Sequence, residues 1–229
     1  GDPGFEDLIA QGYLAEAIIN YVALVGWSPG NDREFFTMDE LKEAFSIEGL
    51  SKSPAIFDET KLRWMNAEYI RKLSPEEYIR HAEPYLEAAG CGHMDKSIFA
   101  RILQPRTEVF TDITETVAFL AKMDEDYSVD LYTNKKSKTN PELCRDILAA
   151  VIPELEALPE WTETALHDFL MNYAAEHGMK NGTLLWPVRI GMAGKAVTPG
   201  GAIEIAVLLG REESLRRLKL SRARLNAAL

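Results

Sequence analysis

Long apolar runs, clustered cysteines and paired histidines are all missing from this sequence of 229 residues. The longest apolar stretch, residues 17–27, is interrupted by Asn20 and is too short for a membrane span, so it is typical of a buried helix. Two cysteines, Cys91 and Cys144, lie far apart and outside any Cys-x-x-Cys pattern, which predicts reduced thiols. The four histidines form no i, i+4 pair that would bind a metal on a helix. No basic-then-apolar leader is visible, and we expect a cytoplasmic protein without a metal site.

Positive charge is scarce as well, since 25 Lys and Arg face 36 Asp and Glu, for a net charge of −11. This balance argues against a protein that coats polyanions, because phosphate binding needs clustered cations. Two basic clusters stand out locally, at residues 135–138 and 211–224. The second either follows a phosphate backbone or, as we favour, forms the solvated face of an amphipathic helix built on Leu215, Leu218 and Leu225. The distribution fits a protein that contacts one RNA at selected points.

Helical periodicity runs through almost the whole chain, and strict apolar–polar alternation is rare. Capping boxes begin at Thr37 and Ser74, and Asn140 followed by proline marks another helix start. The fold class predicted is therefore all-α, as an elongated array of helical domains. We predict helices at residues 5–11, 14–26, 38–45, 59–73, 75–89, 94–104, 108–123, 141–157, 162–177, 184–193, 200–209 and 211–227.

Two seams divide this helical pattern. One lies at residues 73–75, where a capped helix begins, and the other at 124–139, which is polar, weakly periodic and predicted to be a loop or a hinge. The sequence therefore predicts three domains, covering residues 1–73, 74–128 and 129–229.

Several motifs resemble a known family. Residues 12–28 (GYLAEAIINYVALVGWS) and 57–70 (FDETKLRWMNAEYI) are similar to the helical domain that follows the catalytic core of bacterial glutamyl-tRNA synthetases, and residues 187–212 are similar to the end of their anticodon-binding region. The resemblance implies a stem-contact domain over 1–73 that braces the inner corner of the tRNA. It also implies two helical anticodon-binding domains over the remainder.

The same resemblance implies a fragment of a glutamate–tRNA ligase that is inactive alone. ATP and Mg²⁺ would bind in a catalytic Rossmann domain absent from this chain, which itself would hold no cofactor and no catalytic residue. Residues 50–54 are similar to the Lys-Met-Ser-Lys-Ser loop of class I synthetases. The residues on either side, however, resemble the helical domain that follows that loop, so Lys52 is interpreted as structural or solvent-facing. The expected partner is tRNA(Glu), with tRNA(Gln) as an open addition, bound by a monomer away from any membrane.

Arg106 falls where the family directs an arginine at the third anticodon base. Guanidinium offers donors only, cytosine offers two acceptors on its pairing edge, and guanine offers two N–H donors there. Glutamate anticodons end in C and glutamine anticodons in G, so this arginine would separate them by about 1–3 kcal/mol. The alternative is a surface arginine near the C-terminal dipole of a helix.

Arg189 matches an arginine that the family directs at the first anticodon base, and the alternative for it is a plain salt bridge. The adjoining loop is Thr198, Pro199, Gly200 and Gly201, whose backbone and methyl groups would pack on a splayed base. The family pattern sometimes has a large apolar residue after Thr-Pro-Gly, and Gly201-Ala202 stands in its place here, which puts that apolar stacking contact in question.

Lys61 and Trp64 belong to the most specific motif and would support a ribose–phosphate backbone. The favoured interpretation places Trp64 in the core beside Leu62, Met65, Tyr69 and Ile70, and leaves Lys61 open between phosphate contact and none. Trp27 and Trp161 are also assigned to the core, and Trp186 stays open.

Two functions remain from the sequence. The first is tRNA recognition through the anticodon and inner stem. The second is a helical protein-interaction module of synthetase ancestry without RNA binding, which the acidic charge and the altered loop would favour. A chain that is itself an enzyme is disfavoured, because no triad, metal cluster or phosphate loop is visible.

Overall fold

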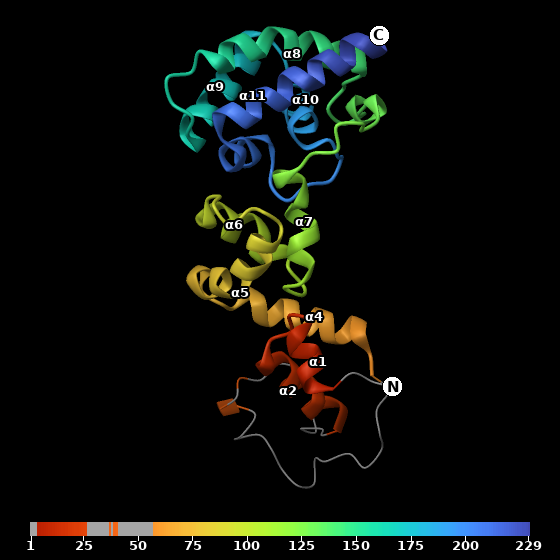
Figure 1. The fold of residues 1–229 in the computed structure, drawn as a ribbon, viewed down its shortest axis with the longest axis vertical. Coiled ribbons are helices and arrows are strands. Elements are labelled where there is room, and N and C mark those ends of the chain that lie inside the picture. Colours follow the sequence, from red (N-terminus) through yellow and green to blue (C-terminus); the bar gives the residue numbers. More distant parts are fainter. Residues whose placement is uncertain (1–3, 27–36, 38, 41–56) are drawn as a thin grey trace. The chain divides into compact units, whose positions relative to one another are not determined.

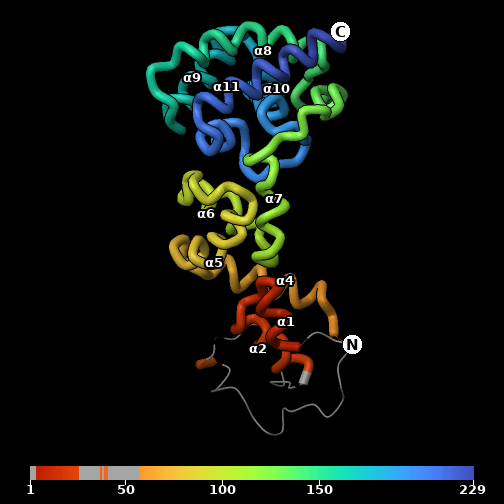
Figure 2. The backbone as a smooth tube through the Cα atoms, viewed as in Figure 1, coloured from red at the N-terminus to blue at the C-terminus, as the bar shows by residue number. Residues whose placement is uncertain are grey.

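The computed structural model describes residues 4–26, 37, 39–40 and 57–229. Over these residues the chain is helical and has no strand, only an isolated bridge between Asn134 and Thr139 (Figures 1 and 2). The predicted all-α class is confirmed. The helices are α1 (Phe5–Ala10), α2 (Ala15–Gly26), α4 (Glu59–Arg71), α5 (Pro75–Ala88), α6 (Lys96–Leu103), α7 (Asp112–Ala121), α8 (Pro141–Glu156), α9 (Glu163–Glu176), α10 (Asn181–Ala193) and α11 (Ala202–Ala228), with 3₁₀ turns η1 (Gln104–Arg106) and η2 (Val129–Tyr132). None of these helices is long and apolar enough to cross a membrane.

Contacts divide the chain into two compact units. Unit 1 comprises residues 1–85 and 99–114, and unit 2 comprises residues 86–98 and 115–229. Helices α5, α6 and α7 therefore contribute residues to both units. The three-domain division inferred from the sequence stays a prediction.

The core of unit 1 forms where α1, α2 and α4 pack together. Apolar side chains three and four positions apart give each helix one buried face. Its buried members are Leu8, Tyr13, Ala17, Ile18, Tyr21, Leu62, Met65, Tyr69 and Val109. Asn66 is fully buried among them and each of its polar side-chain atoms has a partner, because its Oδ1 accepts from the Leu14 amide at 2.9 Å and its Nδ2 donates to the Glu108 carbonyl at 2.6 Å. This amide fixes the start of α2 and the segment before α7 to α4.

Helix α7 begins later than the predicted residue 108. Val109 and Phe110 are buried in unit 1 instead, and the Phe110 amide donates to the Gly12 carbonyl at 3.3 Å. Gly12 has a φ of +94°, and a Cβ there would lie 2.8 Å from the Thr111 nitrogen. Tertiary packing of this turn therefore replaces the first helical turn that local periodicity predicts.

Helix caps follow the predicted signals. The Glu77 amide donates to Ser74 Oγ at 3.1 Å and the Ser74 amide donates to Glu77 Oε1 at 3.3 Å, which completes the capping box of α5. Asn140 accepts from the Leu143 amide at 2.8 Å and so caps α8. Most of the predicted helix 38–45, together with Trp27 and residues 50–54, lies outside the described residues.

In unit 2, α11 packs against α10 and α8, as Figure 1 shows. The predicted break between two helices near residue 210 is present as a kink at Gly210, with φ 82° and ψ 167° inside a 27-residue helix. The segment 124–139 is a packed loop of unit 2, because Tyr132 is fully buried and its hydroxyl lies 2.6 Å from that of Tyr127. Both cysteines are buried free thiols.

Candidate nucleic-acid interface

Arg106 ends η1, a turn whose backbone is held firmly in unit 1. Gln104 Nε2 donates to the carbonyls of Ile70 at 3.0 Å and Leu73 at 2.8 Å, at the C-terminal end of α4 where carbonyls lack helical partners. The Arg106 side chain is exposed. A long cationic side chain thus projects from a fixed backbone position, as a base-reading residue requires.

The residue after Arg106 anchors the turn from the other side. Thr107 is buried, and its hydroxyl donates to the Leu103 carbonyl at 2.7 Å. Because that hydroxyl has one hydrogen, the Tyr78 hydroxyl 2.7 Å away is the donor between the two. Burial raises the pKa of Tyr78, so it remains a neutral donor.

Arg189 on α10 is half-buried and lies between an aromatic ring and a hydroxyl. Its guanidinium carbon is 4.8 Å from the centre of the Trp186 ring, and its Nη1 donates to Thr198 Oγ1 at 3.0 Å. Trp186 is itself fixed, since its Nε1 donates to the Leu131 carbonyl at 2.9 Å. Thr198 Oγ1 donates in turn to the Gly200 carbonyl at 3.0 Å. The arginine and the loop that sequence motifs pair are therefore joined directly.

The electrostatic setting of Arg189 is unusual for an arginine. Burial lowers its pKa. Within the described residues no carboxylate lies within 4.0 Å of it, so the salt-bridge alternative is not what the structure contains. A partly desolvated cation without a counter-charge favours an incoming acceptor group.

The loop between α10 and α11 presents one feature that the sequence motifs do not identify. Thr198 and Pro199 are buried, Gly200 has a φ of +71°, and Gly201 begins α11 as its N-cap. Val197 is 78% exposed beside them. Although no large apolar residue follows Thr-Pro-Gly here, Val197 on the same loop supplies exposed apolar surface.

Trp64 and Lys61 lie three positions apart on α4 and therefore share one helical face. The prediction that Trp64 is a core residue is wrong, because its side chain is 42% exposed. Leu62, Met65 and Tyr69 are buried as predicted and already fill the apolar face of α4, which leaves Trp64 at its edge. Trp161 is half-buried and not fully in the core.

The basic run on α11 is engaged mainly with the protein's own acceptors. Within unit 2 its contacts are Arg211 with the Glu156 carbonyl and the Trp161 ring, Arg216 with Glu213 and Glu125, Lys219 with Glu156, and Arg224 with the Tyr127 carbonyl. The favoured solvated face holds for the exposed Arg216 and Lys219 but is wrong for Arg217, which is fully buried.

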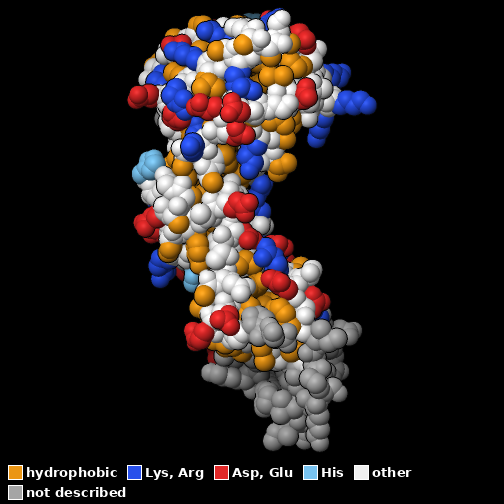
Figure 3. Space-filling model, turned by 45° about the vertical axis from the view of Figure 1, so that its right-hand side comes forward, with side chains coloured by type: hydrophobic (Ala, Val, Ile, Leu, Met, Phe, Trp, Pro, Cys, Tyr) orange, Lys and Arg blue, Asp and Glu red, His pale blue; other side chains and the backbone are white. Residues whose placement is uncertain are grey.

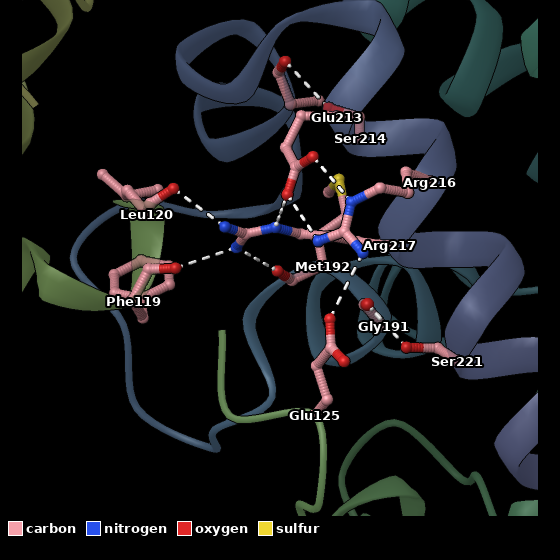
Figure 4. A network of polar contacts seen from close by, with 11 residues as sticks. Phe119, Leu120, Glu125, Gly191, Met192, Glu213, Ser214, Arg216, Arg217 and Ser221 are labelled. Carbon is pink, nitrogen blue, oxygen red and sulfur yellow. Dashed lines mark hydrogen bonds and ion pairs between the residues drawn. The ribbon is translucent and has the colours of Figure 1, made fainter. Parts of the chain in front are cut away.

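Arg217 joins three parts of unit 2 (Figure 4). Its Nη1 donates to the Phe119 carbonyl at 2.8 Å and the Met192 carbonyl at 2.9 Å, and its Nη2 donates to the Leu120 carbonyl at 2.8 Å. Its Nε donates to Glu213 Oε1 at 2.8 Å. The carbonyls belong to the last turns of α7 and α10, so one cation caps two negative helix ends. Hydrogen bonds from the Arg216 and Arg217 side chains lower the pKa of Glu213 to about 2.

Acidic and basic side chains are interspersed over the face of unit 2 seen in Figure 3, without one large basic field. That surface is consistent with the net charge of −11. Affinity for a polyanion would have to come from a few placed cations.

An all-α chain with an arginine seated on an aromatic ring beside a Thr-Pro-Gly loop suggests a helical RNA-binding module, and comparison with known proteins gives its class. The family model for the anticodon binding domain matches residues 59–222, well over half of the sequence, and the chain belongs to that family. A second model, for the catalytic domain of class I tRNA synthetases (E and Q), matches residues 5–64. Part of the predicted stem-contact domain thus falls within the bounds of that catalytic-domain model.

Curated relatives narrow the class further. A glutamate–tRNA ligase of Clostridium novyi is 44% identical over 233 residues, covering 100% of this chain and 48% of the relative. One of Clostridium botulinum (strain Hall) is 46% identical over 227 residues, covering 99% and 47%. The chain is therefore a homologue of glutamate–tRNA ligases and spans about half their length.

Solved structures support the fold. A glutamate–tRNA ligase from Elizabethkingia meningosepticum, crystallised with its amino acid, covers 98% of this chain and 43% of its own with a TM-score of 0.77 and 23% identity. A glutamate–tRNA synthetase from Elizabethkingia anophelis gives a TM-score of 0.73 at 22% identity, covering 97% and 42%.

Proposed function

We propose that this chain recognises tRNA(Glu) as part of a glutamate–tRNA ligase, by contacting the anticodon loop and the inner stem. Glutamate activation with ATP and Mg²⁺ belongs to residues outside it. The observation that carries the proposal is Arg189, a half-buried cation seated on Trp186, bonded to Thr198 and without a carboxylate partner among the described residues. Such a group is built to meet the acceptors of a splayed base.

Arg106 is the proposed reader of the third anticodon base. Its exposed side chain on a fixed turn supports a donor-only contact with cytosine, and guanine would oppose donors with donors. Lys61 and Trp64 share an accessible face of α4 that supports contact with the ribose–phosphate backbone of the inner stem. We propose that one chain binds one tRNA.

The test is a titration of a labelled anticodon stem-loop whose third anticodon base is C or G. The wild-type chain should prefer C, and Arg106→Gln should lose about 1–3 kcal/mol of that preference while most of the phosphate-driven affinity remains. Equal discrimination by wild type and variant would remove Arg106 from the proposal. Using the stem-loop of tRNA(Gln) in parallel shows whether that tRNA is also a partner.

A protein-interaction module without RNA binding is the second candidate, favoured by the net charge of −11 and by the engaged cations of α11. It predicts that no salt-dependent tRNA binding occurs. RNA contact instead gives a log affinity that falls linearly with log salt, so a filter-binding salt series separates the two.

A further inference from the structure

Residues 134–139 of unit 2 form a turn that carries three lysines and has a rigid backbone. The Asn134 amide donates to the Thr139 carbonyl at 3.2 Å, and the Thr139 amide returns a bond to the Asn134 carbonyl at 3.1 Å. Inside this bridge the Ser137 amide donates to Asn134 Oδ1 at 2.7 Å, and Lys138 adopts a φ of 56°. Thr139 Oγ1 donates to the carbonyl of the buried Tyr132 at 2.7 Å. The turn is therefore held in one conformation from both sides.

The same turn is attached to the start of α10. Thr183 Oγ1 donates to the Ser137 carbonyl at 2.7 Å, and a Cβ at Gly182 would lie 3.5 Å from Ser137 Oγ. Lys180 is the N-cap residue of α10, with no side-chain cap and no acidic residue in the first turn. Amide donors and the positive end of the helix dipole thus add to the charge of the lysines.

The lysines of this surface are not paired with carboxylates among the described residues. Lys135, Lys136, Lys138 and Lys180 are all exposed, and none has an ion pair within the part of the chain that the structure describes. The α11 cations behave differently, since acidic side chains or carbonyls lie against nearly all of them. Exposed cations held together on a rigid backbone repel one another, and a bound polyanion relieves that repulsion.

The lysines share a scaffold with the proposed base reader. Thr183, which holds the turn, and Arg189 are six residues apart on α10, a rise of about 9 Å. Between them Trp186 donates to the Leu131 carbonyl on η2, just before the turn. An RNA strand whose base meets Arg189 has its neighbouring phosphates within reach of this surface, as in proteins where a cationic groove follows the backbone beside a stacking ring.

We propose that Lys135, Lys136, Lys138 and Lys180 form a phosphate-contact surface, which we call the lysine turn, for the RNA backbone next to the base read by Arg189. This inference rests on the proposed tRNA binding. The lysine turn contributes affinity that does not depend on base identity, because phosphate contacts carry no sequence information.

The experiment compares two triple variants of equal charge change. Lys135→Gln/Lys136→Gln/Lys138→Gln removes three of the four lysines of the lysine turn, and Lys122→Gln/Lys219→Gln/Arg222→Gln removes three cations elsewhere in unit 2. Dissociation constants for the anticodon stem-loop are measured from 50 to 200 mM salt. Each phosphate contact to a single strand contributes about 0.7 to the log–log slope, so loss of these three lysines should reduce the slope by up to about 2 and the control by much less.

Three further readouts fix the interpretation. Discrimination between C and G at the third anticodon base should be the same in wild type and lysine variant, and Lys→Arg at the three positions should restore the slope. If wild type binds and both triple variants change the slope equally, phosphate contact by the lysine turn is contradicted while the proposal of tRNA binding stands. If wild type itself shows no salt-dependent binding, both proposals fall. Thermal unfolding followed by circular dichroism checks that the substitutions in both triple variants leave the fold intact.

Discussion

Replacing Arg217 by methionine tests whether one buried cation holds unit 2 together. Methionine has about the length of the apolar stem of arginine, but it lacks the guanidinium and so loses the bonds to Phe119, Leu120, Met192 and Glu213. Three carbonyls at helix ends then lose their donor in a site where the arginine is 0% exposed. Removing one partner of a buried ionic arrangement costs about 3–5 kcal/mol, and we expect a loss of unfolding free energy in that range.

The neighbouring Arg216 provides a matched control. It bonds to the same carboxylate, through Nε to Glu213 Oε2 at 2.8 Å, and reaches Glu125 at 3.2 Å, but its side chain is 50% exposed. Water screens such a pair and solvates the groups left behind, so Arg216→Met should cost less than about 1 kcal/mol. The two variants change the same residue type by the same substitution and differ chiefly in burial.

Urea unfolding followed by circular dichroism and tryptophan fluorescence measures both variants. Because the chain has two units, the analysis uses the transition that carries the Trp161 and Trp186 signals of unit 2. Arg217→Lys, which keeps the charge but offers fewer and differently placed donors, should fall between the wild type and Arg217→Met. If Arg217→Met lies within 1 kcal/mol of the wild type, or matches Arg216→Met, the reasoning from burial and carbonyl capping is refuted.

Four other measurements follow from the structure. Gly194→Ala should destabilise unit 2 more than Gly178→Ala, since both glycines have positive φ but only a Cβ at Gly194 would come within 3.0 Å of neighbouring atoms. A smaller or equal loss of unfolding free energy for Gly194→Ala in urea would contradict this. Val197→Ser should weaken stem-loop binding by up to about 2 kcal/mol without changing the free energy of unfolding, because we expect bound RNA to cover this exposed side chain; unchanged affinity would exclude Val197 from the interface. Trp64→Ala should weaken binding of intact tRNA by about 1–3 kcal/mol while leaving the isolated stem-loop unaffected, and an equal effect on both RNAs would argue against stem contact. The pKa of Glu213 is lowered from 4.5 to about 2, so the stability that its ionised form contributes is complete above pH 4.5 and is lost as pH falls toward 2. The difference in unfolding free energy between wild type and Glu213→Gln should therefore narrow over that pH range, and a constant difference would contradict the assignment.

Local signals predicted most of the helical architecture, because caps and apolar periodicity act over a few residues. The capping box at Ser74 and the break at Gly210 needed nothing from the rest of the chain. The start of α7 could not be predicted in this way, since Val109 and Phe110 are drawn from the helix by packing against the Gly12 turn, about a hundred residues earlier. Long-range packing of this kind leaves no periodic signature in the local sequence.

The candidate site was predictable only in part, and for a related reason. Motif resemblance identified Arg189 and Thr198, and the structure joins them at 3.0 Å. Resemblance and periodicity both missed the exposure of Val197. The core interpretation from helical periodicity misplaced Trp64, because exposure depends on which side chains already fill the adjoining core. Whether the assigned residues contact RNA remains a prediction for the titrations above.

The two basic clusters show what charge in a sequence does and does not determine. Arg216 and Arg217 follow Glu213 at three and four positions, a helical spacing that brings the charges together whatever the fold. In the lysine turn, Lys138 precedes Glu142 and Lys180 follows Glu176 by four positions, but neither pair lies within one helix, and the lysine side chains are exposed. Ion pairs within one helix thus account for much of the α11 cluster, and none joins the lysine turn to a carboxylate in the part of the chain that the structure describes. In an acidic chain, it is therefore the cations that secondary structure leaves without counter-charges, and not the largest basic cluster, that are the better candidates for contact with phosphate.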